Sequence, residues 1–425
     1  MSDLRERLRA RMERLYPICR SITGDGVRET LAVLGETVPL EVRAVPSGTP
    51  AYDWTVPDEW NVRDAYVADT TGRRLIDLRE HNLHLVSYST PFRGRLTRAE
   101  LEPHLHTLPD RPEWIPYRTS YYTRDWGFCL SRRAYDALGD GPFDVVVDTT
   151  LAPGELTYGE LVLPGESDGT DHGEILVTSH VCHPSLANDN LAGLTVAVEL
   201  AAWLAEQPRR HTFRFLFAPG TIGAITWLSQ SPEVWPRVRH GLVLTGLGGP
   251  GPLVYKRTRH GDRPVDRAAA HVVRAHSGEL RDYSPYGYDE RQFNALGFDI
   301  AAGRLSRTPH GEYPEYHTSA DDLSLVDDDR LVEALEALQE IVEVLEHDAA
   351  YTNLRPYGEP QLGSYGLYPT TGGRSASDAV MAMLWTLAYS DGDTSLLAIA
   401  DRAGLPFAAL RRAADDLLGA GLLSR

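Results

Sequence analysis

Four side chains that can bind a metal ion occur within one short segment of the chain. The segment SHVCHPSLANDN, residues 179–190, holds His180, Cys182, His183 and Asp189 between an apolar run and a long helical pattern. Imidazole, carboxylate and thiolate are the groups that bind Zn²⁺, which takes about four ligands and keeps one position open at a catalytic site. His183 and Asp189 form the better pair, because a proline fixes the turn between them. His180, at the end of the preceding strand, is the rival ligand.

The same residues also have ordinary structural uses. Asp189 precedes the helical run LAGLTVAVE, where an acidic residue is a natural N-cap. The histidines could be hydrogen-bonded loop residues, and Cys182 is by type more often a small buried side chain than a ligand. A second cluster favours the metal: the segment GEYPEYHTSADDLSLV, residues 311–326, places Tyr316 and His317 before a start of helix rich in Ser and Asp.

Two further segments carry groups suited to a site. YGYDERQF contains the adjacent acids Asp289 and Glu290. VYKRTRHGD contains Arg257 and Arg259 shortly after an apolar strand pattern, in an otherwise acidic chain. Because arginine binds planar anions through two parallel hydrogen bonds, these two residues could hold a substrate carboxylate or phosphate. The alternative is an exposed loop whose cations pair with nearby acids.

The elements that must position these residues follow an α/β pattern. Short apolar runs, EILVTS, TFRFLFAP and GLVLTGL, alternate with apolar helical runs such as LAGLTVAVELAAWLAE, and FDIAAG is also strand-like. This alternation is typical of a mainly parallel mixed sheet with helices on both faces. In such sheets ligands gather at the carboxyl ends of strands, and His180 directly follows EILVTS.

Changes in composition divide the chain into three predicted domains. Residues 1–45 and 141–352 form the α/β domain, and residues 46–140, rich in Trp, Tyr, Pro and short alternating runs, form an inserted β-rich domain. Residues 353–425 comprise a linker, rich in Pro and Gly over 356–375, and three helical runs with the spacing of a winged helix.

The composition restricts the partners and the compartment. A net charge of −18 over 425 residues argues against nucleic acid or an anionic membrane as partner. Three widely separated cysteines are a poor disulfide framework, and the charged N-terminus resembles no signal peptide. We therefore expect a cytoplasmic protein that binds a small substrate, with the C-terminal domain available for homo-oligomer formation.

Several motifs together resemble a known family. LYPICRSITGDGVRETL, VPDEWNV, HPSLANDN and EYHTSADDL are similar to an aminopeptidase-like family, related to the co-catalytic zinc aminopeptidases and the glutaminyl cyclases, with an inserted β domain and a C-terminal winged helix. The resemblance implies that His183 (or His180), Asp189 and His317 bind zinc. It further implies that Asp289 holds substrate or ligands, and that Tyr316 lies where a phenol could donate to an oxyanion.

The chain departs from this family's pattern at two places. The zinc aminopeptidases carry a Glu–Glu pair after the central strand, where this chain has Gly220 and Thr221, and GLVLTGLGGPG lacks the later aspartate ligand. Two metal ions roughly 3.5–4 Å apart need carboxylates between them, so we expect one Zn²⁺ per chain. The missing glutamate also leaves the general base open, and the candidates are Asp289, Glu290, Glu312 and Glu315.

The sequence thus predicts a zinc-dependent hydrolase that cleaves an amide or peptide bond in a small aminoacyl or peptide conjugate. A related alternative keeps the metal but carries out acyl transfer or cyclisation. A third hypothesis, based on the missing glutamates, is a degenerate, non-catalytic peptidase that acts as a binding module.

Overall fold

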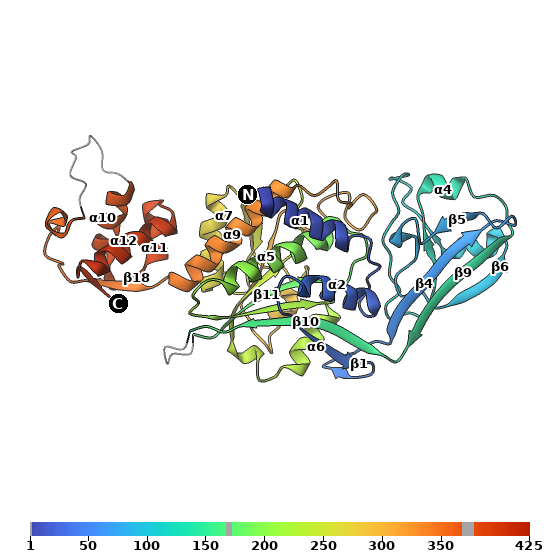
Figure 1. Ribbon diagram of the computed structural model, residues 1–425, viewed down its shortest axis with the longest axis horizontal. Helices are drawn as coiled ribbons and strands as arrows, with labels where there is room; N and C mark the ends of the chain where they lie inside the picture. The colour runs from blue at the N-terminus through green and yellow to red at the C-terminus, as the bar shows by residue number, and fades with distance from the viewer. Residues whose placement is uncertain (1, 167–171, 368–377) are drawn as a thin grey trace. The chain divides into compact units, whose positions relative to one another are not determined.

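The computed structural model describes residues 2–166, 172–367 and 378–425. The chain divides into two compact units (Figure 1). The larger unit comprises Met1–Gly261 and Glu279–Glu336, and the smaller comprises Asp262–Gly278 and Ala337–Arg425.

The larger unit is built on an eight-stranded mixed sheet. Its strands run in the order β1 (Glu41–Pro46), β10 (Glu155–Leu163), β12 (Thr212–Ala218), β11 (Glu174–His180), β13 (Val238–Leu244), β16 (Ala302–Ser306), β14 (Val254–Lys256) and β15 (Glu279–Arg281). The four central strands β12, β11, β13 and β16 are mutually parallel, whereas β1, β10 and β14 join by antiparallel pairing. The predicted fold class, a mainly parallel mixed sheet, is confirmed.

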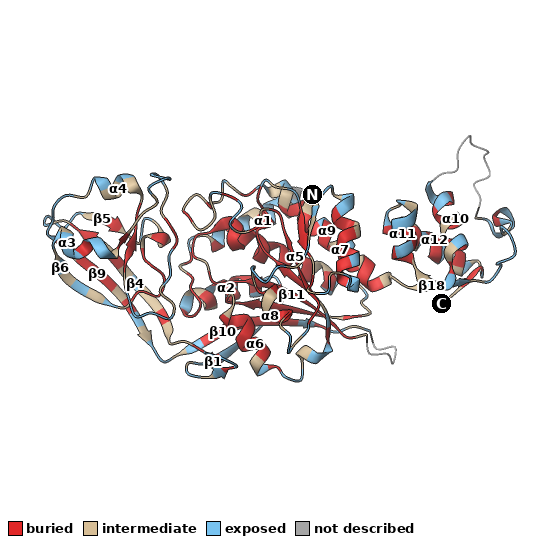
Figure 2. Cartoon of the chain, turned by 180° about the vertical axis from the view of Figure 1, so that it is seen from behind, coloured by how far each residue is buried: buried red, intermediate tan, exposed pale blue. Residues whose placement is uncertain are grey.

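The apolar runs form buried strands because both faces of the sheet are covered by helices. All seven residues of β11 are buried, as a central parallel strand requires. Helix α5 (Gly193–Ala205) packs against β11, while α6 (Ile222–Gln230) lies on the opposite side of the sheet (Figure 1). Figure 2 shows β11 and β10 buried between these layers. The carboxyl end of β11, which carries His180, therefore lies at the end of the covered sheet where the strand passes into a loop.

The remaining helices of the larger unit flank this core. They are α1 (Ser2–Leu15), α2 (Asp25–Gly35), the short α8 (Glu290–Phe293) and the first part of α9 (Asp328–His347). One predicted strand starts later than expected: in FDIAAG, β16 begins only at Ala302. The amides of Phe298 and Asp299 still donate to the carbonyl of Ala295, and Asp299 has a φ of 50°, so the chain is turning there. Within the described ranges, we find no helix with the length and apolarity to cross a bilayer.

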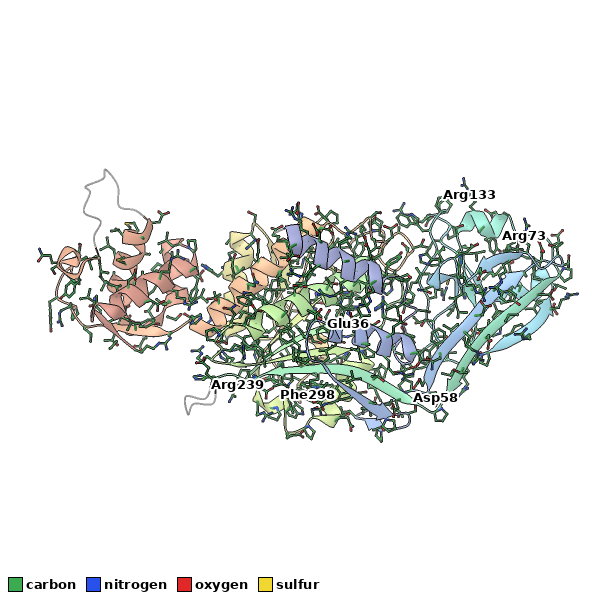
Figure 3. All side chains as sticks on the ribbon, viewed as in Figure 1. Glu36, Asp58, Arg73, Arg133, Arg239 and Phe298 are labelled. Atoms are coloured by element: carbon green, nitrogen blue, oxygen red, sulfur yellow. The ribbon has the colours of Figure 1, made fainter. Side chains whose placement is uncertain are left out.

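A separate antiparallel sheet forms mostly within the region predicted as an insertion. Its order is β5 (Arg74–Asp77), β4 (Glu59–Ala68), β9 (Phe143–Ala152) and β6 (Phe92–Leu96), and two short helices, α3 (Arg98–Leu101) and α4 (Arg132–Asp136), lie in the connections. Short strand pairs complete the region: β2 (Pro50–Ala51) with β3 (Trp54–Thr55), and β7 (Leu105–His106) with β8 (Phe128–Cys129). Figure 3 shows Arg73 and Arg133 among its side chains and Asp58 near the start of β4. Because the whole of β9 follows residue 140, this sheet includes a strand beyond the point where we predicted the insertion to end.

The smaller unit contains the three helices expected at the C-terminus. They are α10 (Asp378–Tyr389), α11 (Leu396–Ala403) and α12 (Phe407–Gly419), with the three-stranded sheet β18 (Asp391–Ser395), β17 (Ala350–Asn353) and β19 (Leu423–Ser424). Helix α7 (Pro264–Ala275) and the end of α9 belong to the same unit, where His271 lies 2.7 Å from Asp401. The predicted linker, 356–375, lies partly outside the described residues.

Candidate metal centre and the cavity beside it

The carboxyl end of β11 and the loop after it bring three of the predicted ligands together. His180 is the last residue of the strand, His183 lies in the loop, and Asp189 belongs to the helical turn Ala187–Ala192 that leads into α5. The possible ligand atoms of these three side chains all lie within 4.8 Å of one another. Asp189 does not act as the helix N-cap, because α5 begins only at Gly193 and the carboxylate faces the imidazoles instead.

His317 reaches the same place from a distant part of the sequence. Its Nε2 atom lies 3.1 Å from Oδ2 of Asp189, while Nε2 of His180 lies 3.0 Å from Oδ1. One carboxylate therefore joins two imidazoles, one on each oxygen. The ring of His183 is centred 4.8 Å from that of His180 and 5.1 Å from that of His317. The structure thus brings all four predicted ligands together rather than favouring His183 over His180.

Buried polar contacts hold the loops that carry these ligands. The carboxylate of Asp321, fully buried, accepts the backbone N–H of Asn188 at 2.6 Å and that of Asp189 at 3.1 Å. The guanidinium of Arg20, also buried, donates through Nε to the carbonyl oxygen of His183 at 3.1 Å. Because both contacts fix backbone atoms beside the ligands, the cluster is positioned by the fold and not by its own side chains alone.

The inserted region supports the other side of the cluster. The amide of Tyr117 donates to the carbonyl of His317 at 2.8 Å, and the amide of Ser319 donates to the carbonyl of Ile115 at 2.8 Å. The Tyr117 ring packs edge-on against both His183 and His317, with ring centroids 5.3 and 5.0 Å apart. The loop that carries His317 is therefore held by backbone pairing with residues of the insertion.

The electrostatics of the cluster suit metal binding. Burial lowers the pKa of His183 to about 3, so its imidazole is neutral at physiological pH. Burial by itself would raise the pKa of Asp189, but the surrounding imidazoles, two of them in direct contact, hold it well below its usual range. Metals bind the neutral imidazole and the ionised carboxylate. Three imidazoles with one carboxylate fit the nitrogen and oxygen donor set of a zinc site.

Cys182, although adjacent, has the character of a buried thiol. Burial raises its pKa to about 12, and its Sγ accepts the backbone N–H of Gly220 at 3.2 Å. The thiolate is the form that binds metal. Cys182 therefore fits the structural role that its residue type suggested.

A small cavity, of about 240 Å³, opens directly beside His180 and His183. Its wall is formed mainly by polar and aromatic side chains. Besides the two histidines they include Tyr121, Tyr288, Asp289, Arg291, His310 and Tyr316. Asp289 and Tyr316 were predicted from the sequence, whereas Arg291, Tyr288 and His310 were not. In the sequence, these three residues could have been identified only from their position in or near YGYDERQF and the segment that carries His317.

The four acids considered as bases lie in different surroundings. Asp289 is 4 % exposed, accepts the backbone N–H of Thr221 at 2.7 Å and lines the cavity. Glu290, its neighbour in sequence, is completely buried and forms ion pairs with Lys256 and Arg304. Glu312 pairs with Arg281, and Glu315 lines another hollow beside Trp114. Of the four, Asp289 alone faces the cavity.

Burial sets the protonation of the groups around the cavity. It raises the pKa of Asp289 to about 6. It also raises the pKa values of Tyr288 and Tyr316 well above their usual range, and the two phenols are hydrogen-bonded to each other. Tyr316 further stacks on the ring of His317 at a centroid distance of 3.9 Å. The cavity thus offers one carboxyl group that titrates near neutrality and two phenols that stay protonated as hydrogen-bond donors.

Arg257 and Arg259, predicted to bind substrate, lie away from this cavity wall. Arg257 donates to the carbonyl of Gly261 at 2.9 Å, and Arg259 forms an ion pair with Asp299. The cation that lines the cavity is Arg291 instead. These contacts match the alternative considered from the sequence, in which the two arginines pair with nearby groups in a loop.

Gly220 and Thr221, at the predicted position of the missing glutamates, border the cavity. Thr221 donates its backbone N–H to Asp289, and its hydroxyl oxygen lies 3.3 Å from Nη2 of Arg291. Thr221 and His317 both have positive φ angles, of 62° and 56°, which residues other than glycine seldom adopt. Such backbone strain is concentrated at functional sites.

Comparisons with known proteins agree with this architecture. A family model described as "Domain of unknown function (DUF4910)" matches residues 9–348, and one described as "winged helix-turn-helix" matches residues 349–425. A Clostridium acetobutylicum protein, named for polysaccharide biosynthesis and for an aminopeptidase-like domain, is 44 % identical over 416 residues, which cover 97 % of this chain and 94 % of that protein.

Solved structures extend the comparison. A crystal structure of a Clostridium acetobutylicum protein described as a peptidase is 42 % identical, with a TM-score of 0.93 over 100 % of this chain and 97 % of that one. A zinc aminopeptidase from Bacillus subtilis is 13 % identical, with a TM-score of 0.57 over 80 % of this chain and 94 % of that one. The predicted resemblance to zinc aminopeptidases is confirmed at the level of the fold, and so is the C-terminal winged helix.

Proposed function

This chain belongs to the family described as the domain of unknown function DUF4910, and from its site we propose that it is a zinc-dependent hydrolase. Its substrate is a small aminoacyl or peptide conjugate, in which it cleaves an amide or peptide bond. The observation that carries this proposal is the carboxylate of Asp189, shared between His180 and His317 beside a small cavity. The fold, which is that of zinc aminopeptidases, supports it.

The four clustered side chains would hold one Zn²⁺ per chain, with His180, His317 and Asp189 as ligands and His183 as the fourth. When bound, the metal supplies a Lewis acid that polarises a carbonyl and acidifies water to near neutrality. A single ion is favoured because Gly220 and Thr221 provide no carboxylate for a second one.

The chain's own residues supply the proton chemistry and the orientation. Asp289 is the general base, because it lines the same cavity as His180 and because a base works best when its pKa is close to the working pH. Tyr316, protonated and on the cavity wall, donates a hydrogen bond to the oxygen on which negative charge develops. Thr221 orients the base through its backbone N–H.

Metal analysis of the purified full-length chain tests the centre. We expect about one zinc per chain, as a three- or four-ligand site of this donor type would bind. His183→Ala combined with His317→Ala should remove it, because two of the nitrogen donors are lost. The matched control is His347→Ala, at the end of α9, which should keep the wild-type zinc content. Full zinc occupancy in the double variant would contradict the proposed centre.

A substrate screen in ¹⁸O-labelled water tests the reaction. The screen contains dipeptides, aminoacyl amides and N-acylated amino sugars; the last are included because of the name of the Clostridium acetobutylicum relative. Hydrolysis places one labelled oxygen in the acid product, whereas cyclisation or acyl transfer to another acceptor places none. If the zinc-loaded protein leaves every compound intact, the proposal is wrong and the non-catalytic alternative is favoured.

A further inference from the structure

Arg291 is a cation on the cavity wall that forms no ion pair with an acid among the described residues, although its charge acts on the neighbouring Asp289. Its Nη2 atom donates to the hydroxyl oxygen of Thr221 at 3.3 Å. Its Nε is buried and has no hydrogen-bond partner among the described residues, and no described acid forms a salt bridge with it. A guanidinium has five N–H donors, and leaving a buried one unmade costs about 1–3 kcal/mol. Its Nη1 makes no hydrogen bond with a described residue and is not buried, so the guanidinium on this wall keeps a donor for a ligand in the cavity.

The groups behind this wall add positive charge. Glu290 is shared by two buried cations, with its Oε1 2.9 Å from Nζ of Lys256 and 3.4 Å from Nη1 of Arg304. Both cations also contact residues of the cavity wall: Lys256 donates to the carbonyl of Tyr286 at 2.8 Å, and Arg304 to Nδ1 of His310 at 3.0 Å. They are thus part of the cavity's surroundings.

The charge balance at this end of the cavity leaves room for one anion. Lys256, Arg304 and Arg291 are three cations, while Glu290 and Asp289 are two carboxylates. Lys256 and Arg304 are buried and share Glu290, whereas Arg291 is half-buried. Even partial burial makes a cation without a counter-charge costly, so a surplus of one positive charge favours a monoanionic ligand group. The chain as a whole carries a net charge of −18, which makes this local surplus a departure from its general character.

Size and shape point to a carboxylate. The cavity, of about 240 Å³, is smaller than the roughly 300–1,000 Å³ of pockets that take drug-sized ligands. The planar fork of a guanidinium matches a carboxylate through two parallel hydrogen bonds. A phosphate dianion carries two negative charges, which is more than the single surplus positive charge can neutralise.

We infer that this cavity binds a free carboxylate of the substrate through Arg291, so that the substrate class is a dipeptide or an N-acyl amino acid. Because Arg291 and the metal-centre residues His180 and His183 line one small cavity, the carboxylate lies close to the bond that is cleaved. The identity of that bond rests on the proposed function, whereas the carboxylate site itself can be measured by binding alone.

Calorimetry with N-acetylglycine and N-acetylglycinamide tests the carboxylate site in the full-length chain. The two probes have nearly the same size and differ in the negative charge. We expect the acid to bind at least tenfold more tightly than the amide, and chelator-treated protein to keep this preference, which excludes binding through the metal. Arg291→Gln should remove the preference without changing the affinity for the amide.

Three further variants sharpen this binding experiment. Arg291→Lys keeps the charge but loses the fork, so it should retain part of the preference. Arg281→Gln, whose native side chain pairs with Glu279 and Glu312, is the matched control and should behave as wild type. Arg259→Gln tests the earlier prediction directly. The inference is overturned if wild type shows no preference, if folded Arg291→Gln keeps it, if Arg259→Gln removes it, or if inorganic phosphate binds more tightly than N-acetylglycine.

Measurements of hydrolytic activity distinguish a failure of this inference from a failure of the proposed function. Alanylalanine and its C-terminal amide are compared as substrates, and we expect at least a tenfold lower KM for the free acid. Equal hydrolysis of both compounds would overturn the substrate inference while leaving the hydrolase proposal intact. If the binding preference is preserved but neither compound is cleaved, the result is the opposite. The carboxylate site is then supported, and the proposed reaction is wrong.

Discussion

Two buried aspartates near the candidate metal centre differ in protonation because their neighbours differ. Asp189 is surrounded by imidazoles, which keep its pKa well below the usual range. Asp289 accepts one backbone hydrogen bond from Thr221, and burial raises its pKa to about 6. Such a separation of pKa values fits the proposed roles, with Asp189 as a metal ligand and Asp289 as the group that transfers protons.

Replacing Asp289 by Asn tests this assignment at the residue scale. The base must be deprotonated to act, so wild-type activity should rise with pH through about 6 and then level off. Asp289→Asn should lower kcat roughly 10²–10⁴-fold and abolish that limb of the profile. A pH series of kcat/KM for both proteins, with zinc content measured in each sample, provides the measurement. An unchanged acidic limb in the variant would exclude Asp289 as the base.

The stability of the same variant serves as a control. The folded-state pKa of Asp289 lies above the unfolded value near 3.9, so the folded protein binds the extra proton between about pH 4 and 6. The contribution of Asp289 to the free energy of unfolding of wild type therefore falls over that window as pH rises, by a few kcal/mol at about 1.4 kcal/mol per pKa unit. Asp289→Asn should lack this contribution. Urea unfolding at pH 4 and pH 7 measures the difference.

At the scale of elements, the centre depends on two contacts between distant segments. The end of β11 supplies His180, and the segment Ile115–Tyr117 of the insertion pairs with the loop that carries His317. Tyr117 is buried and packs against two of the candidate ligands. The region predicted as an insertion therefore supports the candidate metal centre.

Truncating Tyr117 tests this supporting role. Tyr117→Ala leaves a gap beside His183 and His317, so zinc affinity should fall roughly 10–100-fold, as for other residues that orient ligands. The free energy of unfolding should also fall, by about 3–5 kcal/mol. Tyr117→Phe keeps the ring and should retain most of the zinc affinity. Competition with a fluorescent chelator provides the measurement, and equal zinc affinity in Tyr117→Ala and wild type would argue against the role.

For the whole molecule, charge decides which partners the C-terminal unit can have. The family match and the three helices with their small sheet identify a winged helix, a fold that often binds DNA. From residue 376 onward, however, the sequence has six aspartates and four arginines, and the whole chain carries −18. Phosphate binding requires the opposite balance. We expect this unit to serve protein contacts instead.

Fluorescence anisotropy with a labelled random DNA duplex tests this expectation on the full chain. At physiological salt we expect no binding at protein concentrations up to about 100 μM, the weak end of ordinary non-specific affinity. Lowering the salt concentration should not rescue it, because few cations are available to displace counterions. Binding that tightens steeply as salt decreases would show that a basic face has been overlooked.

Local pattern was sufficient for much of the architecture. The alternation of apolar strands and helices predicted the sheet, because a strand covered on both faces must be apolar along its length, as β11 is. The segment 179–190 and His317 were candidates for a different reason, namely their metal-binding residue types and the resemblance of their motifs to the aminopeptidase-like family. The late start of β16 could not be read from FDIAAG, since the turn at Asp299 depends on hydrogen bonds to Ala295.

The membership of the cavity was decided by tertiary packing. Asp289 and Glu290 are neighbours in one acidic segment, yet one faces the cavity and the other is buried between two cations, because consecutive side chains at the start of α8 point in different directions. Arg291 lines the cavity, whereas Arg257 and Arg259, which follow β14, contact Gly261 and Asp299 instead. Sequence determines which chemistry a segment can offer, but distances between segments far apart along the chain arise only when the core is packed.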